Sequence, residues 1–131
     1  PVGASGLMQV MPRTAQHTVQ MYNIPGYSSP SQLLDPRVNI TIGTSYLEYV
    51  YQQFGRNRIL SSAAYNAGPS RVNTWLGNSE GRVDAVAFVE SIPFSETRSY
   101  VKNVLAYDAF YRYLMHRPAK VLTDAEWQRR Y

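Results

Sequence analysis

The sequence predicts an all-α fold, and three observations lead to this prediction. Apolar residues recur at helical spacing, as in the series Ile42, Tyr46, Tyr49 and Val50. Helix start and stop signals divide the chain at short intervals, with a capping residue or Pro before the apolar series and Gly or Pro after several of them. No segment shows the strict apolar–polar alternation of a half-buried strand. The 131 residues are therefore expected to form a single domain of roughly seven helices.

The chain opens on Pro1, inside a Gly-rich bend that is too apolar for a solvated tail. We therefore expect the 131 residues to be part of something longer, with the domain incomplete at its N-terminus. Leu7 and Met8 are expected in the core. Pro12 suits the first turn of a helix that runs to about Tyr22, because its fixed φ is helical and its missing N–H is not needed there.

The second helix has the clearest start signal in the chain. Residues 27–34 are rich in Ser and Pro and are expected to be a loop. Asp35 then provides an N-cap ahead of Pro36 at the first helical position. Phe54 and Gly55 should end this helix.

Capping, Gly and Pro residues also mark the ends of the third and fourth helices. Asn57 is expected to cap a helix whose Ala63–Ala64 pair allows close approach by another helix. A Gly-Pro pair ends it and restarts the chain at Pro69, and Gly77 is expected to stop the helix that follows.

Three further helices complete the expected fold. Asp84 should cap a short helix that ends at an Ile-Pro pair. Ser95 should cap the longest helix, over residues 96–115. Thr123 and Glu126 have the spacing of a capping box for a last short helix.

Composition excludes several classes of function. The chain has no Cys, which rules out disulfides and thiolate metal sites, and His17 and His116 are isolated, so no metal or other cofactor is expected. No apolar run is long enough for a transmembrane helix. The net charge of +4 comes from scattered residues, so a basic nucleic-acid binder is the weakest of the functional classes and no nucleic-acid partner is expected.

Few side chains remain that could carry chemistry. Tyr65 and Asn66 lie where a helix ends at Gly, a place from which side chains can project into a cleft, although helix-end preference and packing also explain them. Three carboxylates are interpreted as helix starters, namely Asp35, Asp84 and Asp124. Two others, Glu48 and Glu126, are interpreted as solvated helix faces. The last two, Glu90 and Glu96, flank an Ile-Pro-Phe corner.

Four motifs follow one another along the chain, at residues 3–15, 64–68, 88–94 and 96–104. The first reads Gly-Ala-Ser-Gly-Leu-Met-Gln-Val-Met-Pro-Arg-Thr-Ala, and the second reads Ala-Tyr-Asn-Ala-Gly. The third and fourth read Phe-Val-Glu-Ser-Ile-Pro-Phe and Glu-Thr-Arg-x-Tyr-Val-Lys-Asn-Val. Together and in this order they resemble the motifs of the Slt-type soluble lytic transglycosylases, with the nearest likeness to the C-terminal catalytic domain of periplasmic enterobacterial members.

The resemblance implies a lysozyme-like fold and the periplasm of a Gram-negative bacterium. The substrate would be peptidoglycan, cut between N-acetylmuramic acid and N-acetylglucosamine. A single Glu would act first as acid on the glycosidic oxygen and then as base toward the sugar's own C6 hydroxyl, leaving a 1,6-anhydro product. This scheme departs from the usual pair of carboxylates and requires a carboxyl whose pKa is raised in an apolar pocket.

The resemblance also implies which residues bind the glycan. Gln9 and Met11 would line a cleft, and Tyr65 and Asn66 would lie by the scissile sugar, with the Tyr65 hydroxyl near the acid. Glu96 would hydrogen-bond a sugar or its peptide. A helix-start carboxylate favoured by the macrodipole is the alternative for Glu96, and both can hold.

The catalytic Glu itself is not expected in this chain. In the family it belongs to a Glu-Ser pair about ten residues before the first motif, and only Pro1 and Val2 precede that motif here. The chain alone is therefore expected to be inactive, with the remaining domains of the parent enzyme as its partners. The alternative is a non-catalytic module that binds peptidoglycan strands or muropeptides.

Overall fold

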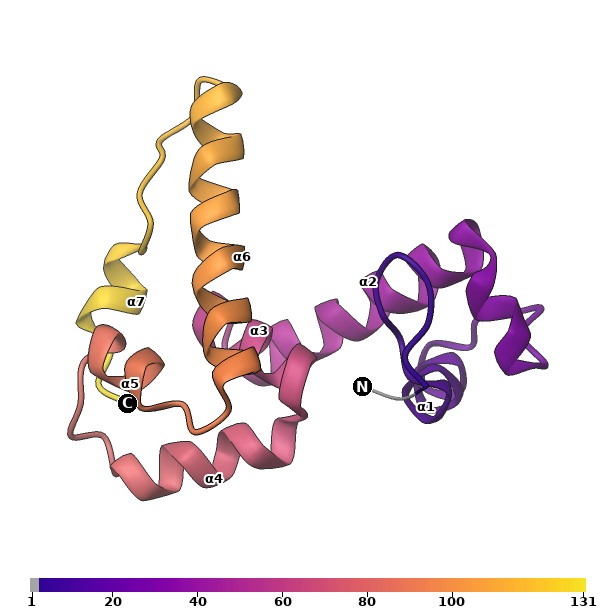
Figure 1. The fold of residues 1–131 in the computed structure, drawn as a ribbon, viewed down its shortest axis with the longest axis horizontal. Helices are drawn as coiled ribbons and strands as arrows, with labels where there is room; N and C mark the ends of the chain where they lie inside the picture. The colour runs from indigo at the N-terminus through magenta and orange to yellow at the C-terminus, as the bar shows by residue number, and fades with distance from the viewer. Residues whose placement is uncertain (1–2) are drawn as a thin grey trace. The chain divides into compact units, whose positions relative to one another are not determined.

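The computed structural model describes residues 3–131, and within that range it is all-α, as predicted (Figure 1). Its one pairing of strand type is an isolated antiparallel bridge between Ser5 and Val10. The chain divides into two compact units, Pro1–Tyr49 and Val50–Tyr131. The helices are α1 (Pro12–Tyr22), the 3₁₀ helix η1 (Pro30–Leu34), α2 (Pro36–Gln53), α3 (Arg58–Ala67), α4 (Pro69–Ser79), α5 (Ala85–Ser91), α6 (Ser95–Leu114) and α7 (Asp124–Gln128).

The first unit is built around a small apolar core. Val10, Ala15, Leu33 and Ile42 are buried together, with residues of α1 and the following loop packed against them. Helix α1 begins at Pro12, as predicted, and its C-cap Asn23 adopts the left-handed conformation with φ 51°. The first unit therefore draws its core from the first-motif turn, α1, η1 and α2.

The segment expected to be a loop contains a 3₁₀ helix, which corrects that prediction. Ser29 and Gln32 form a capping box at the start of η1, and Pro30 occupies its first turn. Leu33 in η1 is fully buried, so packing supports a helical turn that the Ser- and Pro-rich composition did not suggest. Asp35 then caps α2 as predicted, because its Oδ1 accepts a hydrogen bond from the Arg37 N–H at 2.8 Å.

Helix α3 is the central element of the second unit and packs against α4 and α6 (Figure 1). Asn57 caps it as predicted, with its Oδ1 accepting from the Leu60 N–H at 3.0 Å. The Ala63–Ala64 pair is fully buried, as expected for a face on which another helix approaches closely.

Two helix boundaries differ from the prediction. Helix α4 continues past Gly77 and ends at Ser79, with Glu80 as a left-handed C-cap at φ 53°. A Gly inside a helix is tolerated at about 1 kcal/mol relative to Ala, so Gly77 does not stop α4. Ser95 is the first residue of α6 instead of its cap, and the N-cap position is taken by Phe94 without a side-chain hydrogen bond. The predicted Asp84 cap of α5 is confirmed.

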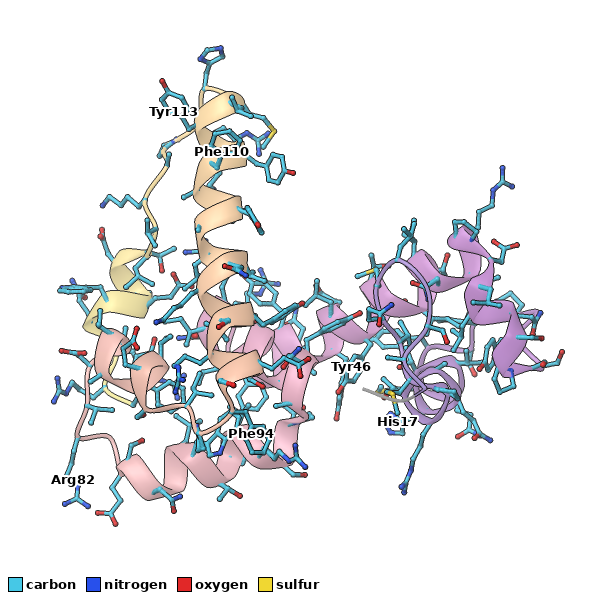
Figure 2. All side chains as sticks on the ribbon, viewed as in Figure 1. His17, Tyr46, Arg82, Phe94, Phe110 and Tyr113 are labelled. Carbon is cyan, nitrogen blue, oxygen red and sulfur yellow. The ribbon has the colours of Figure 1, made fainter. Side chains whose placement is uncertain are left out.

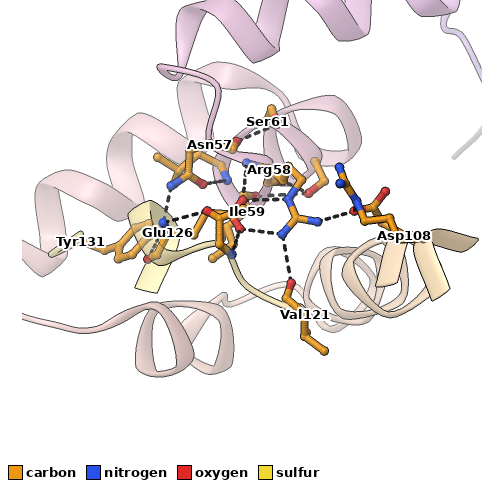
Figure 3. Close-up of polar contacts among 12 residues, drawn as sticks. Asn57, Arg58, Ile59, Ser61, Asp108, Val121, Glu126 and Tyr131 are labelled. Carbon is orange, nitrogen blue, oxygen red and sulfur yellow. Dashed lines mark hydrogen bonds and ion pairs between the residues drawn. The ribbon is translucent and has the colours of Figure 1, made fainter. Parts of the chain in front are cut away.

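The last helix is joined to α3 by a buried ion pair, which corrects the interpretation of Glu126 as a solvated residue. Thr123 and Glu126 form the predicted capping box of α7. The Glu126 side chain is also only 4% exposed and binds Arg58, with an Nη2–Oε1 distance of 2.6 Å and an Nε–Oε2 distance of 2.9 Å (Figure 3). Arg58 further contacts Asp108 of α6 at 2.5 Å. We call Arg58, Asp108 and Glu126 the α3 clamp.

The C-terminal residue extends the contacts of the α3 clamp. The Tyr131 hydroxyl accepts from Asn57 Nδ2 at 2.9 Å and donates to the Glu126 carbonyl at 2.9 Å (Figure 3). Its ring stacks on Phe88 of α5 with 5.1 Å between centroids. The N-terminus of α3 is thus tied to the end of the chain.

Candidate functional site

The first motif forms a tight turn that carries Gln9 and ends at Met11. Ser5 and Val10 exchange two backbone hydrogen bonds of 3.1 and 3.0 Å, and the Gln9 N–H donates to the Gly6 carbonyl at 3.1 Å. Gln9 adopts a left-handed conformation with φ 48°. Its exposed side chain turns back, with Nε2 donating to the Gly6 carbonyl at 2.8 Å. Met11 is the N-cap of α1 and is 37% exposed.

A buried Asn on α2 holds this turn, and the sequence analysis missed it. Asn39 is fully buried. Its Oδ1 accepts from the Met8 N–H at 2.8 Å, and its Nδ2 donates to the carbonyls of Ser5 at 2.7 Å and Leu33 at 3.0 Å. A Cβ on Gly6 would lie 2.2 Å from Asn39 Nδ2, so only Gly fits at that position. An Asn among the apolar residues of a helix was the available signal.

The two apolar residues of the turn have different environments. Leu7, which was expected in the core, is 72% exposed, because it lies within the turn that the Ser5–Val10 bridge closes. Met8 packs against the core cluster of the first unit, as expected. Gly43 of α2 makes room for it, since a Cβ there would lie 2.6 Å from the Met8 sulfur.

In the second unit, the end of α3 meets the start of α6. Tyr65 and Asn66 lie in the last turn of α3 and are half-buried, and Glu96 is exposed in the first turn of α6. The neighbour of Glu96, Thr97, is only 2% exposed, and its hydroxyl donates to Asn66 Oδ1 at 2.7 Å. This contact brings two of the predicted site segments together.

Aromatic residues lie beside the start of α6. Phe94, labelled in Figure 2, contacts Trp75 edge-on with 5.6 Å between ring centroids. The Arg71 guanidinium lies 4.6 Å from the Phe94 ring centroid, within the range of a cation–π contact. Phe94 itself is 40% exposed. Glu96 is therefore preceded by a partly exposed aromatic surface with a positive charge on it, a combination suited to sugar rings and anionic groups.

Most of the nine acidic side chains of the chain are committed to structural contacts. Asp35 and Asp84 cap helices. The ion pairs are Glu80–Arg82, Glu90–Lys102, Asp124–Lys120, Asp108 with Arg58 and Arg112, and Glu126–Arg58. Glu96 belongs to none of the ion pairs found among residues 3–131.

Among residues 3–131, the one buried carboxylate is Glu126, and it does not suit acid catalysis. Burial by itself raises the pKa of Glu126, but hydrogen bonds from Arg58 and Thr123 and the Arg58 charge outweigh it and hold this pKa below its ordinary value. A general acid for a glycosidic bond needs the opposite shift. Glu126 is therefore a structural anion.

The described residues also offer no metal centre and no membrane span. Residues 3–131 contain no group of three or more His, Asp or Glu side chains placed to hold a metal ion. His17 is exposed on α1 and contacts the Tyr49 ring edge-on at 6.2 Å. In the same range, no helix is both long and apolar enough to cross a bilayer.

The predicted site residues thus fall into two groups. Gln9 and Met11 belong to the first unit, and Tyr65, Asn66 and Glu96 belong to the second. The structure supports the proximity of Asn66 to the Glu96 segment through Thr97. A groove shared by all five residues stays a prediction.

Comparison with known protein families gives two matches. The model of the transglycosylase SLT domain matches residues 1–88, and that of the soluble lytic transglycosylase helical domain matches residues 91–119. The soluble lytic murein transglycosylase of Escherichia coli strain K12 is 76% identical over all 131 residues. The chain spans only 20% of the length of that relative.

Solved structures give the same result. The crystal structure of the 70-kDa soluble lytic transglycosylase from Escherichia coli covers the whole chain with a TM-score of 0.96 at 76% identity. A complex of the 70-kDa soluble lytic transglycosylase with bulgecin A gives a TM-score of 0.97 at 76% identity. In both cases this chain spans 21% of the solved chain. The expected lysozyme-like fold is confirmed by these likenesses.

Proposed function

Because this chain belongs to the transglycosylase SLT domain family, we propose that it forms the glycan-binding part of a lytic murein transglycosylase. The enzyme would cleave peptidoglycan between N-acetylmuramic acid and N-acetylglucosamine and release 1,6-anhydro products. The observation that carries this proposal is the family match to residues 1–88, a segment that holds four of the five predicted site residues. The identity of 76% across the full chain supports it.

The proposed roles come from the family resemblance, and the exposure of the side chains supports them. Gln9 and Met11 lie on a hydrogen-bonded turn and are exposed, as residues that line a cleft must be. Tyr65 and Asn66 lie at the end of α3, and Glu96 begins α6 beside an aromatic corner. In this proposal Tyr65 and Asn66 contact the scissile sugar, and Glu96 hydrogen-bonds a neighbouring sugar or its peptide.

The proton donor would come from outside these 131 residues. Asp35 and Asp84 are helix caps, and five other acidic residues form ion pairs. Glu48 is exposed on α2, and Glu96 is exposed on α6, without the apolar enclosure that acid catalysts use. General acid help is typically worth ~10²–10⁴-fold, so this chain by itself should bind muropeptides weakly and cleave nothing.

The reaction needs one carboxyl group to serve twice. As an acid it protonates the leaving glycosidic oxygen, and as a base it removes the proton of the C6 hydroxyl while that oxygen attacks C1 of the same sugar. The residues of this chain would hold the sugar ring so that O6 reaches C1 before water does. Orienting reacting atoms in this way accounts for a large share of enzymatic rate enhancement.

The proposed partners and compartment follow from the family. The glycan strands of peptidoglycan and their muropeptides would be the ligands, in the periplasm of a Gram-negative bacterium. Bulgecin A is present in the complex of a protein 76% identical to this chain, so we propose that the enzyme containing this chain also binds it. The rest of the parent enzyme would complete the site.

Digestion of purified sacculi tests the proposal. Three proteins are compared: this chain, a version extended upstream to include the expected Glu-Ser pair, and the full-length enzyme. Mass spectrometry should detect 1,6-anhydro muropeptides from the full-length enzyme and none from the short chain. If the short chain releases them at a comparable rate, the acid lies within these 131 residues and the assignment of roles is wrong.

The alternative function is a non-catalytic glycan-binding module. It is favoured by the arrangement of the acidic residues, because binding needs exposed polar and aromatic groups but no proton donor. The two functions differ in one outcome of the same experiment. A full-length enzyme that binds sacculi but releases no anhydro product would support the binding module.

A further inference from the structure

We propose that Thr97 is a positioning residue that fixes the Asn66 side chain as a hydrogen-bond donor toward the glycan. This inference rests on the proposed function, because it assumes that Asn66 faces a sugar. It adds a residue and a direction: the amide N–H of Asn66 would bind an acceptor oxygen of the substrate.

The hydroxyl of Thr97 is unusual among the helical Ser and Thr residues. Such hydroxyls commonly donate to the carbonyl four residues earlier in the same helix. Thr18, Thr44, Ser45 and Thr74 all do so here. Thr97 lies in the first turn of α6, where the residue four positions earlier precedes the helix. Its hydroxyl is therefore available for a tertiary contact.

That contact is made with a second helix. Thr97 Oγ1 donates to Asn66 Oδ1 at 2.7 Å, across 31 residues of sequence. Thr97 is 2% exposed, so the hydrogen bond is shielded from water at the Thr97 end. Water competes poorly for such a bond, which makes it effective at holding one orientation of the amide.

The orientation of Asn66 has a chemical consequence. A side-chain amide has one acceptor oxygen and one donor NH₂ group. In the structure Thr97 donates to the amide oxygen, so the NH₂ group is the part of the half-buried Asn66 amide that is left to meet a further partner. A flipped amide could also pair with the Thr97 hydroxyl, which accepts as well as donates, but it would present an acceptor to that partner. The orientation in the structure therefore makes Asn66 a donor.

The contact also links the two segments of the site in the second unit. Thr97 directly follows Glu96, and Asn66 directly follows Tyr65. A hydrogen bond between Thr97 and Asn66 therefore sets the spacing between the backbone that carries Tyr65 and the backbone that carries Glu96. Loss of the hydroxyl should disturb binding without removing any group that touches the substrate.

The test uses the full-length enzyme that contains this chain, with two readouts. The first is the release of 1,6-anhydro muropeptides from sacculi, and the second is the dissociation constant for a purified muropeptide by calorimetry. Thr97→Val removes the hydroxyl but keeps the shape. We expect it to weaken muropeptide binding and to lower kcat/KM, each by about tenfold, as for the loss of one positioned hydrogen bond. Thr97→Ser should restore both to within about twofold.

Thr18→Val is the matched control. Thr18 is also buried and also loses a side-chain hydrogen bond, but its hydroxyl donates within α1 to the Thr14 carbonyl and not to a predicted site residue. We expect Thr97→Val and Thr18→Val to lower the thermal midpoint similarly, while Thr97→Val alone weakens binding. If both variants weaken muropeptide binding equally, Thr97 has only a structural role and the proposal is overturned.

Two variants of Asn66 complete the experiment. Adding Thr97→Val to Asn66→Ala should not weaken muropeptide binding further, because Thr97 acts through the Asn66 amide. If the two substitutions have additive effects on the dissociation constant, the proposal is overturned. Asn66→Asp keeps the acceptor but loses the donor, so it should bind muropeptide as weakly as Asn66→Ala, and near-normal binding would overturn the donor assignment.

A wild-type enzyme that binds muropeptide without releasing anhydro product would contradict the proposed function alone, since the dissociation constants still test Thr97.

Discussion

Replacing Glu126 with Gln should destabilise the second unit strongly, because it removes one charge from the α3 clamp. The Glu126 carboxylate accepts hydrogen bonds from the Arg58 side chain and from the backbone N–H groups of Arg58 and Thr123. Its side chain is 4% exposed and that of Arg58 is 18% exposed. Arg58 would keep Asp108 and the Val121 carbonyl as partners. The substitution therefore leaves a mostly buried cation with half of its counter-charge.

The expected magnitude follows from this geometry. Removing one member of a buried ion pair costs about 3–5 kcal/mol, and the remaining Asp108 places Glu126→Gln near the lower end, at about 3 kcal/mol. For a chain of this size that corresponds to a fall in Tm of about 10 °C. Urea unfolding followed by circular dichroism measures the change. Glu80→Gln is the control, because Glu80 is 63% exposed and its partner Arg82 is 70% exposed. This substitution should change the free energy of unfolding by less than about 0.5 kcal/mol.

The pH dependence gives a second check with a defined sign. The pKa of Glu126 is lowered in the folded state from its ordinary value of 4.5. A lowered carboxyl pKa contributes stability that is fully present above the unfolded value and is lost as the pH falls through the folded value. Wild type and Glu126→Gln should thus differ most at neutral pH and converge in acid. Curves that stay parallel below pH 4.5 would refute the reasoning.

Three other predictions concern the turn of the first motif and the end of α3. Asn39→Leu should cost about 3 kcal/mol in urea unfolding, because it leaves buried backbone groups without partners, and should speed hydrogen exchange of the Met8 amide. Gly6→Ala should lower the free energy of unfolding by more than about 2 kcal/mol, because the added Cβ would collide with Asn39. The control Gly26→Ala has a similar φ but open space around it, so it should cost about 1 kcal/mol. Equal losses of stability in the two variants would contradict this explanation. Tyr65→Phe in the full-length enzyme should raise the free energy of the transition state by about 1–3 kcal/mol while barely changing stability, and unchanged turnover on sacculi would remove Tyr65 from the mechanism.

The caps could be predicted from the sequence because their physics is local. Asp35, Asn57, Asp84 and Thr123 each accept from a backbone N–H two or three residues ahead, so their partners are fixed by spacing alone. The stop at Gly77 failed for the opposite reason. The left-handed C-cap is Glu80, whose N–H donates to the Leu76 carbonyl, and no local pattern marks this non-Gly position as the end of the helix.

The residues that the sequence analysis missed act over long distances in the chain. Asn39 reaches Met8 across 31 residues, Thr97 reaches Asn66 across 31, and Arg58 reaches Glu126 across 68. No local pattern names such a partner. A solvated capping Glu and a buried capping Glu look alike in sequence, so Glu126 was interpreted as a solvated residue and its burial was not anticipated.

These buried polar residues explain how ordinary helices can hold a site accurately. Apolar side chains pack with little directionality, so they fix which faces meet but not the rotation of a terminal turn. Asn39 holds the turn that carries Gln9 through both ends of its amide, and Thr97 donates to the Asn66 amide oxygen. Among residues 3–131, no buried side-chain nitrogen or oxygen lacks a partner. A substitution that keeps the side-chain volume but removes one of these polar groups should therefore leave the helices formed and displace the site residues. For this reason Thr97→Val and Asn39→Leu can separate an effect on function from an effect on the fold.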